Sequence, residues 1–495
     1  MLARMPRTGQ QVITPTLVNS EYCCIASYLK NCYLLTNSDY DEDCAYGAAL
    51  EHSRNCFDMY MSDECESCYK GINLRKCFKT FFSFECENCV EVYFSKNLKG
   101  CSYCFGCVNL RNKAYHIFNT PRTKESYFQE LRKINFGSYA AVLKIRKEAE
   151  EYAKKLPNRF MTGTHNINTT GEYIFHSKNV RQSHQVLNAE DCKFCHFLWM
   201  ANTKDAYDFT MWGGDASMIY ECMEAGGGLS RAKFCFECWC PAHDVQYCME
   251  LSEANSNLFG CYALRNKSYC ILNKQYSKEE YGSLIPKIIQ QMNEMPYISE
   301  SRDQNLEIRK IEYKYGEFFP NELSPFAYNE TIAQEYFPLT KETAHAKRYQ
   351  WREPEERKYE VSMRAGDLPD HIRDATDKIL KETIGCEHER KCAEQCTSAF
   401  RITPAEFEFY RKINISLPRL CPNCRHYARI SQRNPLKLWK RKCQCAGTQS
   451  QNRSYGNMTD HFHGSSPCHN EFETSYVPDR PEIVHCEKCY QAEVI

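Results

Sequence analysis

The chain has 495 residues, a formal net charge of zero and 32 cysteines. Its length indicates two to four domains. Because its charge is balanced, whole-chain electrostatics indicates no partner. No apolar run approaches the length of a membrane span, and the first residues contain no apolar signal-peptide core.

The cysteine density indicates either a disulfide scaffold or a reduced, metal-binding chain. Many of the cysteines fall as Cys-x-x-Cys, which is the spacing of a metal knuckle. Disulfide-dense domains are small, whereas this chain is long. The sequence therefore predicts a soluble protein of the reducing cytoplasm, with no membrane contact.

Residues 1–120 contain an internal repeat. Cys23, Cys44, Cys65, Cys86 and Cys107 are spaced by 21 residues, and this spacing splits into steps of 12 and 9. The segments between them are short and β-prone. A parallel β-solenoid explains the pattern, because equivalent positions of stacked coils form ladders and reduced cysteine packs as a small apolar side chain.

Residues 161–275 repeat with a different period. Phe209, Cys222, Cys235, Cys248 and Cys261 are spaced by 13 residues, and a parallel apolar track runs three residues before them. This pattern predicts a second β-solenoid. Metal sites at its Cys-x-x-Cys pairs are the alternative, but no clear partner ligands accompany them, so core packing is favoured.

A helical cap is predicted after each solenoid. The sequence around Phe105-Gly-Cys107 recurs around Phe259-Gly-Cys261 at an offset of 154, and a helix start follows each copy. Ser277 and Glu280 form a capping box, with Thr123 as its weaker counterpart. The first helix is predicted to continue through residues 140–156, so that 121–160 form a cap and linker.

Residues 276–385 are predicted to form the second cap and an irregular connector. Cysteine is absent from most of this stretch, and proline, tyrosine and charged residues are frequent. Helices are expected over residues 340–350 and 368–383, the latter because its apolar residues recur on one stripe.

Cysteine returns in residues 386–495, which we predict to be a tandem zinc-binding region. Cys392-x3-Cys396 is followed by Cys421-x2-Cys424, and the second pair opens a predicted helix. This order is typical of a treble clef, and four thiolates complete a closed, structural zinc site. Cys386 is the alternative to Cys392 in this set.

A second zinc site is predicted farther along the chain. Cys468-x3-Phe472 repeats Cys396-x3-Phe400, and Cys486-x2-Cys489 follows. These three thiolates leave the fourth ligand open: Cys443 or Cys445 is favoured, with His463 as the alternative. The predicted cofactor is therefore Zn²⁺, with two structural ions per chain.

A basic segment lies between the two predicted zinc sites. From residue 401 to 442 there are eleven Lys or Arg residues against two acids, with aromatic residues between them. This pattern is typical of contacts to RNA or DNA phosphates without sequence specificity, and a solvated basic face is the alternative. The candidate nucleic-acid-binding residues are Arg425, Arg429, Arg433, Lys437, Trp439, Lys440, Arg441 and Lys442.

The chain resembles an uncharacterised cysteine-rich repeat family of candidate-phylum bacteria with C-terminal treble-clef zinc-binding domains. The matching stretches are 259–281, 336–340, 417–426 and 472–483. The resemblance implies a metal-binding role for the cysteines of the two zinc sites and implies no activity.

The sequence favours a non-catalytic scaffold or binding protein that contacts nucleic acid or a protein partner through the basic zinc-module segment. Walker loops, nucleophile elbows, His-Glu-x-x-His and Rossmann glycines are absent from the sequence, and no small-molecule substrate is evident. A structural or assembly protein is the first alternative. A polysaccharide-active enzyme with Asp205, Asp208 and Asp215 on a β-helix is the second.

Overall fold

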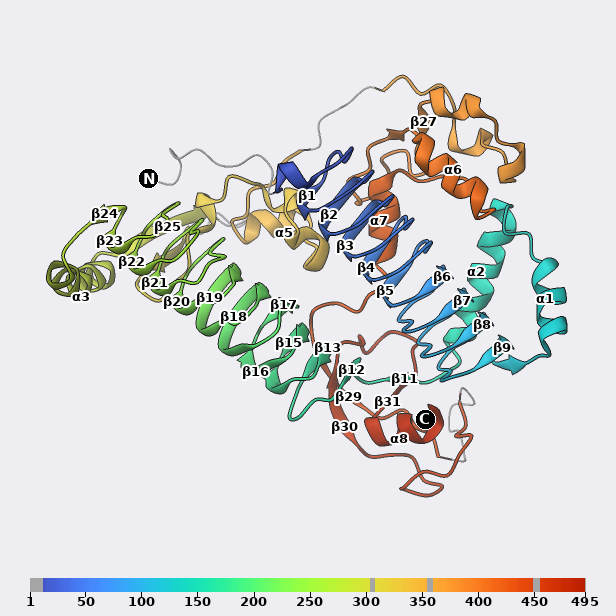
Figure 1. Ribbon diagram of the computed structural model, residues 1–495. Helices are drawn as coiled ribbons and strands as arrows, with labels where there is room; N and C mark the ends of the chain where they lie inside the picture. Colours follow the sequence, from blue (N-terminus) through green and yellow to red (C-terminus); the bar gives the residue numbers. More distant parts are fainter. Residues whose placement is uncertain (1–11, 303–307, 354–358, 448–454, 495) are drawn as a thin grey trace.

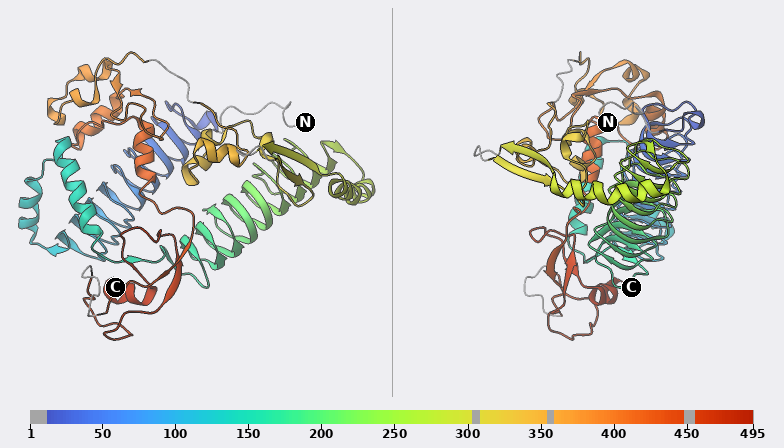
Figure 2. Two further views of the ribbon diagram at one scale, coloured as in Figure 1. Left: turned by 180° about the vertical axis from the view of Figure 1, so that it is seen from behind. Right: turned by 90° about the vertical axis from the view of Figure 1, so that its left-hand side faces the viewer.

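A computed structural model describes residues 12–302, 308–353, 359–447 and 455–494. The chain is mainly β and forms two parallel β-solenoids in tandem, as predicted. The two solenoids run in opposite directions along similar diagonals and lie partly side by side, and the C-terminal part of the chain lies against the first solenoid and beside the junction between the two (Figures 1 and 2). No helix within these described ranges is long and apolar enough to cross a membrane.

The first solenoid begins with a 3-10 turn, η2 (Thr14–Thr16), and consists of short parallel strands. These strands are β1 (Cys24–Ser27), β2 (Tyr33–Asp39), β3 (Ala45–Glu51), β4 (Tyr60–Asp63), β5 (Ile72–Arg75), β6 (Phe78–Phe81), β7 (Val90–Tyr93), β8 (Ser102–Phe105) and β9 (Ala114–Ile117).

Each coil of the first solenoid has 12 residues, because Val90 pairs with Ser102 and Ser102 with Ala114. A residue with positive φ occurs at every third position and turns the chain, so a coil of 12 has 12/3 = 4 corners. In the coil 44–55 the corners are Tyr46, Ala49, His52 and Asn55, and the inward residues are Cys44, Gly47, Leu50 and Ser53. The 21-residue spacing is therefore one coil of 12 plus three sides of the next.

Cysteine suits this narrow interior because its thiol donates to backbone carbonyl groups. The Cys44 Sγ lies 3.3 Å from the carbonyl oxygen of Glu42 and 3.4 Å from that of Ser53. Burial raises the pKa of Cys32 to about 12, which keeps this thiol protonated. Small inward side chains that can donate a weak hydrogen bond are thus favoured on the ladders.

The left-handed corners give the first testable prediction. Asn88 occupies an exposed corner with φ +52°, and a β-branched residue adopts this conformation only with strain. We expect Asn88→Val to lower the free energy of unfolding by about 1–2 kcal/mol, and Asn88→Gly to have little effect. Urea denaturation of both variants measures this, and equal stability of the two would contradict the assignment of the corners.

The second solenoid has longer central strands and coils of variable length. Its strands are β12 (Gly163–Thr164), β13 (Gly171–Phe175), β14 (Lys178–Arg181), β15 (Ser183–Leu187), β16 (Ala189–Lys193), β17 (His196–Leu198), β18 (Thr203–Gly213), β19 (Ser217–Gly226), β20 (Ser230–Lys233), β21 (His243–Gln246), β22 (Ser256–Phe259) and β23 (Ser268–Ile271).

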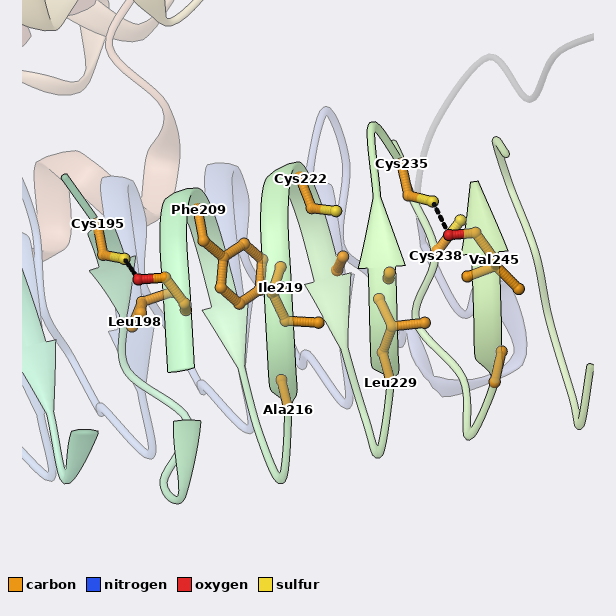
Figure 3. Packing of buried hydrophobic residues seen from close by; sticks show 14 of the residues in the cluster. Cys195, Leu198, Phe209, Ala216, Ile219, Cys222, Leu229, Cys235, Cys238 and Val245 are labelled. Carbon is orange, nitrogen blue, oxygen red and sulfur yellow. Dashed lines mark hydrogen bonds between the residues drawn. The ribbon is translucent and has the colours of Figure 1, made fainter. Parts of the chain in front are cut away.

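The predicted 13-residue ladders are confirmed in this solenoid. Phe209 pairs with Cys222, and the Ala206 track continues through Ile219 to Ala232, with these side chains in one buried core (Figure 3). In the coils around Gly213 and Gly226, the thirteenth residue is accommodated at a glycine corner. A Cβ on Gly226 would lie 1.6 Å from the carbonyl oxygen of Gly213, so only glycine fits the stacked turn.

Two buried histidines in the second solenoid predict acid sensitivity. Burial lowers the pKa of His184 to about 3 and that of His196 to about 4. Because the unfolded chain binds these protons near pH 6.5, stability is lost as the pH falls from about 6.5 toward 4, by at most about 1.4 kcal/mol per pH unit for each histidine.

We expect His184→Gln to reduce this pH dependence by about one proton, measured by urea denaturation at several pH values. His165→Gln, at an exposed histidine of the same solenoid, is the control. Any destabilisation caused by loss of metal at low pH would affect both variants equally. An unchanged slope in the His184 variant would contradict the prediction.

Each solenoid ends in an antiparallel turn and a helical cap. Strand β10 (Thr120–Pro121) folds back on β9, and β24 (Lys274–Gln275) on β23. Thr123 then caps α1 (Lys124–Arg132), and the predicted capping box of Ser277 is present at α3 (Lys278–Glu294). The predicted continuous helix through 140–156 is wrong, because the chain breaks after α1 and Ser138 caps a separate α2 (Tyr139–Ala153).

The connector is irregular, as predicted, but one of the two helices expected in it is not formed. Residues 368–383 form separate 3-10 turns instead of a helix, because local caps such as the His371 side chain compete for backbone N–H groups. The elements of the connector are β25 (Tyr297–Arg302), β26 (Ile308–Tyr313), η3 (Asn321–Leu323), η4 (Tyr328–Glu330), α4 (Ala333–Tyr336), α5 (Lys341–Ala346), η5 (Ala365–Asp367), η6 (Ile372–Asp374) and η7 (Asp377–Lys381).

The C-terminal region consists of two modules. Module 1 (residues 384–433) contains β27 (Ile384–Gly385), β28 (Ala399–Phe400), α6 (Pro404–Lys412) and α7 (Pro422–Ile430). Module 2 (residues 436–494, with 448–454 outside the description) contains β29 (Trp439–Lys442), β30 (Glu471–Thr474), β31 (Val484–His485) and α8 (Glu487–Val494).

Candidate metal centres

Module 1 brings four cysteines together through two local structures. Strand β27 pairs antiparallel with β28, which places Cys386 beside the Cys396 turn. Cys421 is the N-cap of α7, and Pro422 favours a helix start at the next residue. The Cys424 side chain therefore lies one helical turn from Cys421, facing the β27–β28 pair.

The four sulfur atoms of Cys386, Cys396, Cys421 and Cys424 all lie within 4.8 Å of one another. Zinc–sulfur bonds of about 2.3 Å in a tetrahedron require sulfur atoms about 3.8 Å apart, and the Cys386–Cys424 distance is 3.8 Å. The Cys421 pKa lies below its ordinary value because the thiols of Cys386 and Cys424 donate to its sulfur. This set fits a closed zinc site, and Cys386 takes the place that the sequence assigned to Cys392.

Module 2 repeats the arrangement. The sulfur atoms of Cys443, Cys468, Cys486 and Cys489 lie within 4.8 Å of one another, and all four residues are buried. Cys443 follows β29, and Cys486 and Cys489 lie at the start of α8. The backbone N–H of Cys486 donates to the Cys443 sulfur at 3.2 Å. Of the two candidates for the fourth ligand, the structure places Cys443 in this group, with Cys445 next to it.

Each four-cysteine group adjoins a second set of ligand atoms. His388, Cys392 and Glu394 surround Cys424, and Cys445, His461 and His463 surround Cys489. Cys392, Cys445 and His463 are predicted from the sequence as members or alternatives of single sites, whereas His461 and Glu394 are not predicted as ligands. The signal for both was the one-residue spacing of each pair, Cys392-x-Glu394 and His461-x-His463.

The solenoid cysteines belong to a different environment. Among the described residues, none of them joins a group of three or more potential ligands. Cys101, Cys104 and Cys107 are at most 1% exposed in the core of the first solenoid. The prediction that these cysteines pack the core is confirmed.

Two of the eight predicted nucleic-acid-binding residues are buried. Arg425 and Arg429 are each 3% exposed, so their predicted contact with nucleic acid is wrong for this structure. Both project from α7 into the wall of the first solenoid. Arg429 Nη1 lies 2.6 Å and Arg425 Nη1 3.2 Å from the carboxylate of Asp58, and Arg425 also pairs with Glu406 at 2.9 Å.

The remaining basic residues are divided between an interface and an exposed strand. Arg433 lies over the rings of Tyr60 and Tyr336 and is half-buried. Lys437, Lys440 and Lys442 are exposed, whereas Trp439 and Arg441 are half-buried. In the β29–β30 ladder, acidic partners stand opposite two of the lysines, Lys440 facing Glu473 and Lys442 facing Glu471.

The acidic residues suggested for a polysaccharide-active site do not share one face. Asp205 and Asp208 lie exposed at adjacent corners of one coil. Asp215 lies in the next coil and accepts a hydrogen bond from Asn202. Corner side chains point away from the solenoid in different directions.

Comparisons with known proteins identify no family. No protein-family model and no curated protein matches the sequence significantly. One solved structure with local similarity is described as a "putative acetyltransferase" from Desulfovibrio desulfuricans G20, with 8% identity and a TM-score of 0.12. The match covers 48% of this chain and 63% of that chain.

Proposed function

We propose that this protein is a non-catalytic scaffold in which two zinc-binding modules hold two β-solenoids in one fixed relative position. The single observation that carries the proposal is helix α7. Its first turn supplies two cysteines of the Cys386 group, and its next turns carry Arg425 and Arg429 into the first solenoid. A metal ion at this group would therefore position the buried ion pairs that attach module 1. The treble-clef fold of both modules stays a prediction, supported by the second cysteine pair at each helix start.

Apolar contacts support the attachment of module 1. The rings of Phe57 and Phe409 are stacked with centroids 4.3 Å apart, and Tyr410 packs edge-on against Tyr69 at 5.6 Å. Tyr46 donates to the buried carboxylate of Glu406 at 2.9 Å. The face of the solenoid and the zinc module thus share one core.

Module 2 contacts both solenoids where they meet. Tyr490 of α8 accepts a hydrogen bond from Asn97 and donates one to Asn109, both in the first solenoid. On the other side, Ser475 donates to Glu172 of the second solenoid at 2.7 Å. Strand β31 also pairs with β11 (Asn158–Arg159), the segment that joins the first cap to the second solenoid.

Chelation of zinc from the full-length protein tests this proposal, with hydrogen exchange as the readout. We expect modules 1 and 2 to lose protection while amides of the solenoid coils remain protected, because the solenoid ladders are independent of metal. Retention of full protection in both modules after metal loss would contradict the proposed role.

The scaffold also presents an aromatic face to which a protein partner could bind. Tyr28 and Tyr40 stack at 4.6 Å on successive coils, and Tyr40 stacks on His52 at 5.0 Å. These tyrosines are 50% and 52% exposed. Exposed aromatic ladders of this kind supply large contact areas at low entropic cost.

Nucleic-acid binding is the second candidate function, and it depends on the exposed lysines near β29. Lys437 lies over the Trp439 ring at 5.3 Å, which leaves a small basic and aromatic patch. Because Glu471 and Glu473 stand opposite Lys442 and Lys440, we expect no retention on RNA or heparin at physiological salt. Retention that is lost in Lys437→Glu/Lys440→Glu would favour the nucleic-acid function over the scaffold alone.

A further inference from the structure

One cysteine in each module belongs to two ligand groups at once. Cys424 completes the set of Cys386, Cys396 and Cys421, and it also completes the set of His388, Cys392 and Glu394. Cys489 has the same double membership in module 2. A thiolate sulfur has lone pairs enough to bind two cations, so a shared cysteine can bridge a pair of zinc ions.

The outer group of module 2 has the geometry of a built metal site. The Cys445 sulfur lies 3.0 Å from His461 Nδ1 and 3.3 Å from His463 Nε2, and this Nε2 lies 3.4 Å from the Cys489 sulfur. Two sulfur atoms and two imidazole nitrogen atoms therefore converge on one centre. Cysteine and histidine are the ligands that zinc prefers in proteins.

The far nitrogen of each imidazole is held by an acceptor. His461 Nε2 lies 2.8 Å from the carboxylate of Glu493, and His463 Nδ1 lies 2.7 Å from the carbonyl oxygen of Ser466. Both Glu493 and His461 have fully buried side chains. Such outer contacts fix the tautomer of a metal-binding histidine and leave its near nitrogen free to coordinate.

The outer group of module 1 shows the same convergence. His388 Nδ1 and Glu394 Oε2 are buried atoms 2.9 Å apart, yet neither has a hydrogen-bond partner of suitable geometry. The Cys392 sulfur lies 3.7 Å from that of Cys424, close to the sulfur–sulfur edge of a zinc tetrahedron. The four ligand atoms of this group all lie within 4.8 Å of one another.

The two modules are related position by position. The first outer ligand follows the first cysteine by two residues in each module, as His388 after Cys386 and as Cys445 after Cys443. The other two outer ligands are separated by one residue in each module. The residue types differ, but every equivalent position carries a side chain that can bind zinc, which chance does not readily produce.

Charge also favours two ions in module 2. With one Zn²⁺, the four thiolates of the inner group carry a net charge of +2 − 4 = −2 and the Cys445 thiol is left without a metal, whereas the five thiolates of Cys443, Cys445, Cys468, Cys486 and Cys489 with two ions carry +4 − 5 = −1. These residues are all buried, and buried uncompensated charge is costly. We propose that each module holds two zinc ions bridged by one thiolate, Cys424 in module 1 and Cys489 in module 2. The inference rests on the proposed zinc-binding function of the modules.

Native mass spectrometry of the full-length protein tests the number of ions. We expect four zinc ions per chain, three in His461→Ala/His463→Ala, and four in the control His469→Ala, whose exposed histidine adjoins Cys468 but belongs to no ligand group. Two ions in the wild type, unchanged in the double variant, would overturn the paired sites and leave the zinc modules intact. A chain without zinc would instead refute the proposed function itself.

The bridge is tested on the wild-type chain loaded with ¹¹³Cd²⁺, which needs no variant to fold. A shared thiolate should give scalar coupling between two cadmium resonances in each module. Four resonances without mutual coupling would overturn the bridge while keeping four sites.

Discussion

Asp58→Asn is expected to lower the free energy of unfolding by about 3–5 kcal/mol, because it leaves buried guanidinium charge without its anion. The Asp58 side chain is fully buried between Arg425 and Arg429. Chemical denaturation measures the loss, and hydrogen exchange should show that module 1 opens before the solenoid does.

Asp43→Asn is the matched control for this prediction. Asp43 also occupies a left-handed corner of the first solenoid, with φ +55° against +56° at Asp58. It is only half-buried and accepts a hydrogen bond from Asn31, so we expect a change within about 0.5 kcal/mol. Equal effects of the two substitutions would contradict the role of the buried ion pairs.

Cys421→Ser is expected to abolish zinc binding at the four-cysteine group of module 1 and to unfold that module locally. Structural zinc sites contribute about 10 kcal/mol or more of binding free energy to folding, and loss of a ligand removes most of it. We expect loss of hydrogen-exchange protection over residues 386–433, with zinc content reduced in parallel.

The control for this substitution is Cys56→Ser in the first solenoid. Cys56 is fully buried, and its thiol lies 3.2 Å from the Arg54 carbonyl oxygen. A serine hydroxyl can make the same contact, as it does at other inward positions such as Ser95. We expect a loss of about 1–2 kcal/mol and unchanged zinc content. A larger effect here than at Cys421 would argue against a metal role for module 1.

Both solenoids could be predicted from the sequence because their inward residues recur at fixed spacings. The 13-residue ladder from Phe209 to Cys261 is the spacing of the coils themselves. In the first solenoid the cysteines alternate between sides, so their 21-residue spacing conceals the 12-residue coil. The rule beneath the first solenoid is the left-handed residue at every third position, which tyrosine, glutamate and asparagine occupy alike, so composition does not reveal it.

The four-cysteine groups were predictable in their Cys-x-x-Cys pairs and less so in their other members. Cys421 and Cys424 mark a helix start by spacing alone, whereas Cys386 is brought to them by the β27–β28 pairing. The basic segment was interpreted without knowledge of its partners. Asp58 lies more than 360 residues before Arg425 and Arg429, and only the packing of α7 on the first solenoid identifies these arginines as interface residues.

Small-angle X-ray scattering of the zinc-loaded and zinc-stripped protein tests the central claim most directly. With zinc bound, we expect the profile of two solenoids held in one fixed arrangement. After stripping, it predicts a broader distribution of shapes while circular dichroism retains the β-solenoid signal. An unchanged scattering profile from protein that has verifiably lost its zinc would show that the modules do not hold the solenoids together.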